Sequence, residues 1–167
     1  MSRLNSFLIL LAALALLLFL QASGIFQLGH VRANLLVAFF IFLVAMRLPA
    51  WQIFGLLFVF AGLTFLDTPA AGKEALVFSA VIAASFVLRR MLSGRALIDF
   101  ALLLVFASAS FFYAIPLLSH FAKEGFALSG IAFPPSRTLF LEMGMNFFAG
   151  LLMVLVGGGM ISRISRS

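Results

Sequence analysis

The sequence predicts an all-α integral membrane protein, a bundle of about six transmembrane helices. Of its 167 residues, 65% are hydrophobic and only 10% are charged, whereas soluble domains are about half apolar and about a quarter charged. A water-soluble fold of this length could not bury so much apolar surface, but a lipid bilayer can cover it. The apolar residues fall into separate runs, and lysine and arginine stand mainly at the ends of those runs.

The runs predict a single transmembrane domain that covers residues 1–167. We expect its spans at about residues 4–22, 33–47, 50–66, 74–89, 96–118 and 138–161. The second and third are short for about 30 Å of hydrocarbon. Proline blocks helix continuation, so Pro49 makes these two spans an antiparallel hairpin. The longest loop, 119–137, is expected to lie on the membrane surface because it carries apolar residues.

The distribution of basic residues predicts the orientation. With six spans, seven of the Lys and Arg residues fall on one face and four on the other, so the positive-inside rule places both termini in the cytoplasm. A five-span arrangement, with one terminus outside, stays open. Cleavage of the first span as a secretory signal also stays open, because Arg3 precedes a short apolar stretch that ends in small residues.

The sequence predicts no catalytic residue, cofactor or metal site. Its formal charge of +6 does not indicate nucleic-acid binding, since the basic residues are scattered rather than gathered in a stripe. Cysteine is absent, which excludes disulfides and thiolate ligands. His30 and His120 fall in predicted outer loops with no carboxylate at ligand spacing. There is no Ser–His–Asp set or phosphate-binding glycine loop, so we expect no enzyme activity.

The fifth span carries a charged pair and a run of small residues. Asp99 lies four residues after Arg95, a spacing that favours an ion pair near the membrane edge. A proton or ion relay is the alternative, because a charged group costs about 2.5–3.5 kcal/mol at the bilayer centre. The small residues at 107–110 predict a close contact with another helix.

The sixth span carries a stripe of polar and small residues. Glu142, Asn146 and Gly150 follow one another at steps of four, which places them on one side of a helix. Such a face lets a neighbouring helix approach closely and offers it hydrogen bonds. We expect this face, together with Gly55 and Gly62 of the third span, to be a packing or partner-binding surface.

Four short segments stand out by their order along the chain. They are Arg32-Ala33-Asn34-Leu35-Leu36, the stretch from Gly55 through Gly62-Leu63 to Asp67, Gly72-Lys73-Glu74-Ala75-Leu76, and the set Glu142, Gly144 and Asn146. In this order they resemble the rod-shape-determining MreD family of bacterial inner-membrane proteins, whose members have a similar length. Ala33 stands where the family has proline. Because Asn34 lies in one of these segments, the resemblance implies that it also belongs to the packing or partner-binding surface.

The resemblance implies a non-catalytic membrane scaffold of the bacterial cell-elongation machinery, which governs cell shape and peptidoglycan synthesis. It implies the cytoplasmic membrane as the location, and MreC-like and peptidoglycan synthase proteins as partners. The family fold is similar to the substrate-binding subunits of energy-coupling-factor vitamin transporters. A vitamin-binding subunit of that kind is therefore an alternative function, and a small independent transporter is another.

Overall fold

The computed structural model describes residues 3–25, 27–28, 31–32, 34–67, 69–92, 96–124 and 135–164. Within them the chain forms six α-helices: α1 Arg3–Ser23, α2 Leu35–Ala45, α3 Ala50–Asp67, α4 Pro69–Leu88, α5 Ala96–Glu124 and α6 Ser136–Ile164. A 3-10 turn, η1 Arg89–Met91, follows α4. The predicted all-helical fold is confirmed, apart from two-residue strands that the sequence did not predict, β1 Gln27–Leu28 and β2 Val31–Arg32, which pair antiparallel.

Three helical stretches in the described part of the chain are long and apolar enough to cross a membrane. They are Leu4–Ser23, Leu97–Phe121 and Arg137–Val156. Most of each stretch is not buried by the rest of the chain, so its apolar side chains need a lipid environment to be covered. The predicted class, a helical membrane protein, is supported by these three stretches, and the six-span count stays a prediction.

Two of the helices are clearly longer than the predicted spans. α4 begins at Pro69, five residues before the expected start, because proline suits the first turn of a helix, where its missing N–H would have no partner. α5 continues through Pro116 to Glu124, since membrane helices tolerate proline when neighbouring groups satisfy the freed carbonyl. His120 therefore lies in a helix, and the predicted loop 119–137 is shorter at its start.

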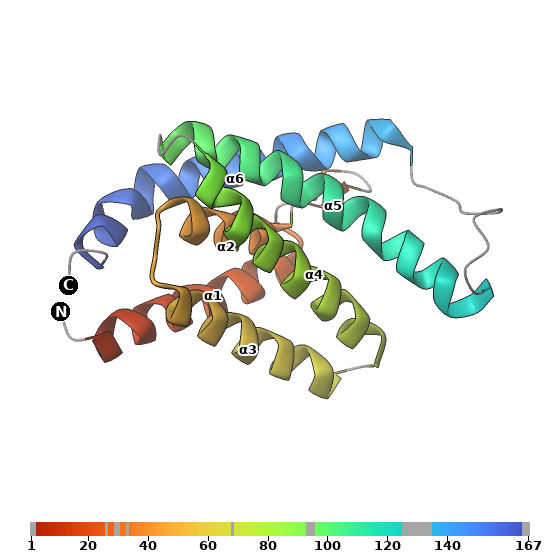
Figure 1. Cartoon of the computed structure of the whole chain (residues 1–167), viewed down its shortest axis with the longest axis horizontal. Coiled ribbons are helices and arrows are strands. Elements are labelled where there is room, and N and C mark those ends of the chain that lie inside the picture. Colours follow the sequence, from red (N-terminus) through yellow and green to blue (C-terminus); the bar gives the residue numbers. More distant parts are fainter. Residues whose placement is uncertain are drawn as a thin grey trace.

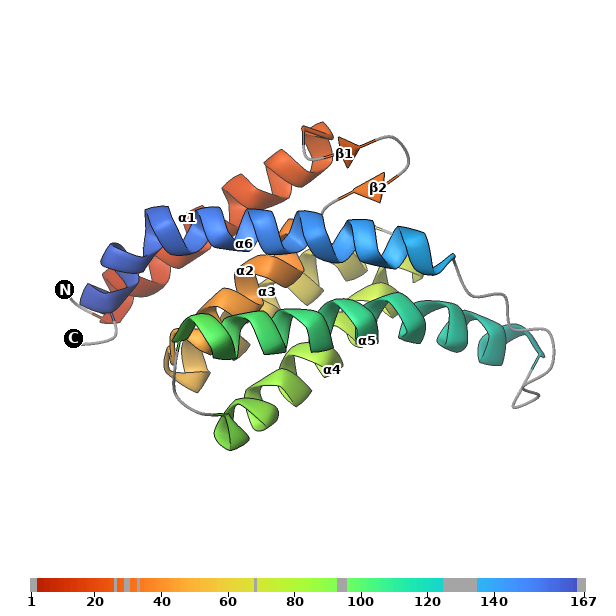
Figure 2. The same cartoon turned by 90° about the horizontal axis from the view of Figure 1, so that it is seen from above.

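The second helix is the centre of the bundle. All eleven residues of α2 are buried, as expected for a helix that is apolar on every side. It packs against α1, α4, α5 and α6, which come from both halves of the sequence. Figures 1 and 2 show that α1 begins and α6 ends on the side of the molecule that holds the turn between α2 and α3.

The turn after α2 is a Schellman motif built on an arginine. The N–H of Arg47 donates to the Val44 carbonyl at 3.1 Å, and the N–H of Leu48 donates to the Leu43 carbonyl at 3.2 Å. Arg47 has a φ of 58°, the left-handed conformation that usually calls for glycine at this position. Leu48 is buried directly after it. The motif closes the last turn of α2 and sends the chain back as α3.

Aromatic rings from three of the helices contact one another in the core. Phe40 of α2 meets Phe78 of α4 edge to face, with centroids 5.4 Å apart. Phe60 of α3 lies 5.0 Å from the same Phe78 ring and 6.5 Å from Phe40. Such pairs add about 0.5–1.5 kcal/mol each beyond the apolar area that they bury. The aromatic triangle fixes α3 and α4 against the central helix.

Candidate functional site

Side chains accept hydrogen bonds from backbone N–H groups in the first turn of α2. Asn34 precedes the helix, and its Oδ1 accepts a hydrogen bond from the Val37 N–H at 3.1 Å. From α1, Gln21 Oε1 accepts the Leu36 N–H at 3.3 Å. The first N–H groups of any helix lack partners within the helix, and in a membrane each unpaired group costs several kcal/mol. These two amides therefore let α2 begin inside an apolar bundle.

Asn146 joins this helix start to the other half of the chain. Its Oδ1 accepts the backbone N–H of Asn34 at 2.6 Å, and its Nδ2 donates to Ser108 Oγ at 3.1 Å. Asn146 is 0% exposed and Ser108 is 1% exposed. We call Gln21, Asn34, Ser108 and Asn146 the amide network. It connects α1, the start of α2, α5 and α6 through hydrogen bonds that lipid cannot replace.

Gly150 lies one turn beyond Asn146 and lets α6 approach α5 closely. A Cβ atom built on Gly150 would fall inside the contact distance of Phe100 Cζ, with two further atoms of that ring at 3.0 and 3.2 Å. Phe100 is itself 1% exposed, so its ring has little room to move. Asn146 and Gly150 thus lie together inside the bundle, and their side of α6 packs against α5.

The other residues of the predicted packing or partner-binding surface do not belong to the amide network. Gly55 packs against α1, since its built Cβ would lie 3.1 Å from the Phe7 ring. Among the described residues, Gly62 and Gly144 have nothing within 4 Å of a built Cβ, so they are not close-packing positions within that part of the chain. Glu142 is half-buried, on α6, one turn before Asn146.

The charged pair predicted in the fifth span is described only in part. Asp99 lies in the first turn of α5 and is 1% exposed, a place where the helix dipole stabilises a carboxylate. Arg95 lies outside the described residues, so the ion pair between them stays a prediction. Asp99 is thus buried within the bundle, and its expected position near the membrane edge stays a prediction.

A partly open cavity of about 130 Å³ lies beside the amide network. We call it the polar cavity. Its polar lining comes from four helices or their ends and consists of Gln21, Asn34, Thr64 and Glu74. Its aromatic lining consists of Phe60, Phe78 and Phe111. The cavity therefore combines one carboxylate, two amides and a hydroxyl with three rings, the kind of lining that small-molecule sites use.

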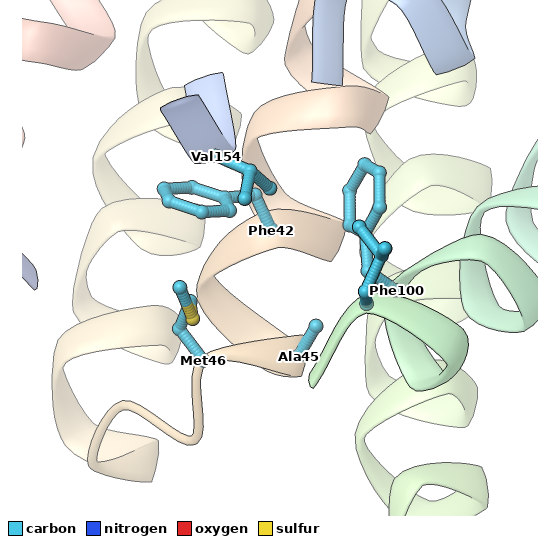
Figure 3. Close-up of a pocket in the computed structure, with 6 residues that line it drawn as sticks. Phe42, Ala45, Met46, Phe100 and Val154 are labelled. Atoms are coloured by element: carbon cyan, nitrogen blue, oxygen red, sulfur yellow. The ribbon is translucent and has the colours of Figure 1, made fainter. Parts of the chain in front are cut away.

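A second cavity, shown in Figure 3, is too small and too apolar to be a site. Its volume is about 20 Å³, and Phe42, Met46, Phe100 and Val154 are among its lining residues. That volume is about the size needed for one water, but a buried water also needs two to four polar partners. The side chains around this cavity offer none, so we read it as a dry packing gap between α2, α5 and α6.

Three arginines gather where α2 and α4 end. Arg89 Nη1 donates to the Val44 carbonyl at 2.9 Å, and its guanidinium lies 4.6 Å from the centroid of the Phe86 ring. Burial, and then the charges of Arg47 and Arg90, lower the pKa of Arg89 from its ordinary value. Arg89 thus caps the last turn of α2, and the three charges mark one end of the bundle as basic.

The polar cavity was not predicted from the sequence. Gln21 is a lone amide near the end of an otherwise apolar run, and Thr64 is a lone hydroxyl near the end of another. An isolated polar residue at the same end of two spans is the signal that could have found it, since polar groups in membrane helices turn toward the bundle interior. No such signal in the sequence predicts that Phe111, which lies 90 residues beyond Gln21, also lines the cavity.

Comparisons with other proteins leave the site to be interpreted from its geometry. No protein-family model, curated protein or solved structure matches the chain. Among the described residues, no group of three or more His, Cys, Asp or Glu side chains is placed to hold a metal ion.

Proposed function

We propose that this chain is a six-span, non-catalytic scaffold of the bacterial cytoplasmic membrane, and that it serves cell elongation by holding partner proteins. The observation that supports this proposal best is the hydrogen bond from the Asn34 N–H to Asn146 Oδ1, 2.6 Å long. Asn34 and Asn146 belong to two of the four segments that resemble the MreD family. Glu74, from a third segment, lines the cavity beside them.

The meeting of these segments favours a shared architectural role. Asn34 and Asn146 are 112 residues apart in the sequence, and a polar side chain inside a membrane protein is retained where it specifies contacts between helices. The contact between two of the resembling segments is the structural observation that we offer in support of the scaffold function.

Two open glycines offer places for a partner helix. Gly62 on α3 and Gly144 on α6 are exposed, with nothing within 4 Å of a built Cβ. Small residues on a membrane-facing helix let another helix pack closely. Both glycines lie in segments that carry the resemblance, and we assign them to the partner-binding surface.

A pull-down of the tagged protein in mild detergent tests the scaffold function. We expect the wild-type chain to recover an MreC-like protein or a peptidoglycan synthase, and Gly144→Leu to recover at least fivefold less, because a leucine blocks close helix approach. Ala84→Leu, at an exposed position on α4, is the matched control and should recover wild-type amounts. Recovery of ABC-type ATPases with a membrane coupling subunit would instead identify a vitamin-transporter subunit.

Cysteine labelling tests the six-span arrangement, and the chain has no native cysteine to remove. With both termini in the cytoplasm, Ser23→Cys and Pro135→Cys should react with an impermeant maleimide on intact spheroplasts. Arg90→Cys should react only after permeabilisation. All three positions are exposed. Labelling of positions 23 and 90 from the same side would contradict the proposal, since an odd number of crossings must separate them.

The polar cavity also favours a second candidate, a vitamin-binding subunit. In the six-span arrangement the cavity faces outward, because Gln21 and Asn34 flank the connection between α1 and α2. Its volume of about 130 Å³ is small for a vitamin, since drug-sized ligands occupy about 300–1,000 Å³. The scaffold is therefore the better-supported function. Tight binding of a vitamin to the purified chain would reverse this preference.

A further inference from the structure

The size of the polar cavity limits what it can hold. Its volume is about 130 Å³, and an engineered protein cavity of about 150 Å³ holds one benzene molecule. The part of a ligand that lies inside the cavity can therefore be about as large as a single six-membered ring.

The charge of the cavity selects a cation. Glu74 is the one charged residue among the described residues that line the cavity, and it is exposed, which places its carboxylate at the mouth. Thr64 donates its hydroxyl proton to the carbonyls of its own helix, at 3.0 Å from Phe60 O and 2.9 Å from Ala61 O. Its Oγ1 then has lone pairs left to accept a hydrogen bond. A carboxylate and a hydroxyl acceptor together favour a ligand that donates hydrogen bonds and carries positive charge.

The aromatic wall suits the same kind of ligand. Phe60 and Phe78 have ring centroids 5.0 Å apart, and Phe111 meets Phe78 edge to face at 6.0 Å. Phe60 and Phe78 are buried, at 6% and 3% exposed, so they form the deeper part of the cavity. Aromatic faces attract organic cations and also cover their carbon atoms. The lining thus changes from a carboxylate at the mouth to rings at the base.

We propose that the polar cavity binds a small organic ammonium ion, with its nitrogen at Glu74 and Thr64 and its carbon framework against Phe60, Phe78 and Phe111. This inference goes beyond the scaffold function and does not depend on it. The ammonium group has two sources, a free amine or the headgroup of phosphatidylethanolamine in the surrounding bilayer.

Benzylammonium is the probe that matches the cavity, and toluene is its uncharged counterpart of nearly the same shape. We expect titration of the detergent-purified chain, followed by NMR saturation transfer, to give a dissociation constant of about 0.1–1 mM for benzylammonium. Toluene should bind at least tenfold more weakly. Glu74→Gln should weaken benzylammonium binding about two- to fivefold and leave toluene binding unchanged, because an exposed carboxylate contributes modestly. Glu142→Gln, a carboxylate outside the cavity, is the matched control and should bind like the wild type.

A second arm separates the two sources. In nanodiscs of phosphatidylethanolamine, a lipid headgroup in the cavity should raise the apparent dissociation constant of benzylammonium at least threefold relative to nanodiscs of phosphatidylcholine, which is equally uncharged overall but has no N–H group to donate. Equal values assign the cavity to a free amine. Equal binding of benzylammonium and toluene, or no binding of either to protein that elutes as a single folded species, overturns the proposal. Loss of binding in both Glu74→Gln and Glu142→Gln overturns it as well, since the cavity carboxylate would then have no particular role.

Discussion

Replacing Asn146 by leucine is expected to lower the free energy of unfolding by about 2–4 kcal/mol. The substitution removes the acceptor of the Asn34 N–H and the donor to Ser108 Oγ. Leucine has nearly the same size, so the loss comes from the N–H left unpaired inside the bundle rather than from a new cavity. Unfolding by sodium dodecyl sulfate in mixed micelles, followed by circular dichroism, measures the change.

Two further variants show whether the backbone N–H of Asn34 carries this effect. Ser108→Ala removes one hydrogen bond and leaves Asn34 paired, so it should cost about 1 kcal/mol. Phe148→Leu changes a nearby residue whose side chain is 60% exposed, and it should cost less than about 0.5 kcal/mol. If Asn146→Leu were no more destabilising than Phe148→Leu, the amide network would have no part in holding α2 against α6.

Replacing Gly150 by alanine is expected to destabilise the bundle by about 1–3 kcal/mol. The new methyl group would overlap the ring of Phe100, which is buried between α5 and α6. The helices must separate or the ring must leave its rotamer, and overpacking of either kind is costly in a close-packed interior. The same unfolding measurement in mixed micelles applies.

Alanine at another glycine of α6 is the control. Gly144→Ala has nothing within 4 Å of its new Cβ, and alanine favours a helix over glycine by up to about 1 kcal/mol, so it should be neutral or stabilising. Combining Gly150→Ala with Phe100→Leu should recover part of the loss, because the smaller side chain leaves room for the methyl. Equal effects at positions 144 and 150 would show that the contact with Phe100 does not decide the outcome.

The helical membrane class could be predicted because composition and apolar runs are properties of the whole sequence, so no single residue decides them. The sequence also singled out Asn34 through the family resemblance, and Asn146 and Gly150 because a polar or very small residue inside an apolar run is rare enough to be noticed. It could not show that the first two bond to each other, because helical spacing describes one helix and not the neighbour across it.

Other physical reasons explain why the helix bounds and the cavity could not be predicted. The expected start of the fourth span at residue 74 left Pro69 outside the helix, whereas α4 begins at Pro69. A proline can either follow the end of one helix or begin the next, and only the packing of the surrounding chain decides between the two. The burial of α2 on all sides leaves no polar stripe to mark its orientation. The polar cavity needs the ends of four helices to converge, which is a property of their tilt rather than of any local pattern.

The complete enclosure of α2 bears on how the protein is made. The helix has eleven residues and a length of about 16 Å, so it cannot reach across about 30 Å of hydrocarbon without its flanks. Its partners α5 and α6 begin at Ala96 and Ser136, long after α2 has left the ribosome. During synthesis α2 must therefore remain in a lipid environment until α5 and α6, which will surround it, have been made. A chain that stops before α5 has an incomplete core.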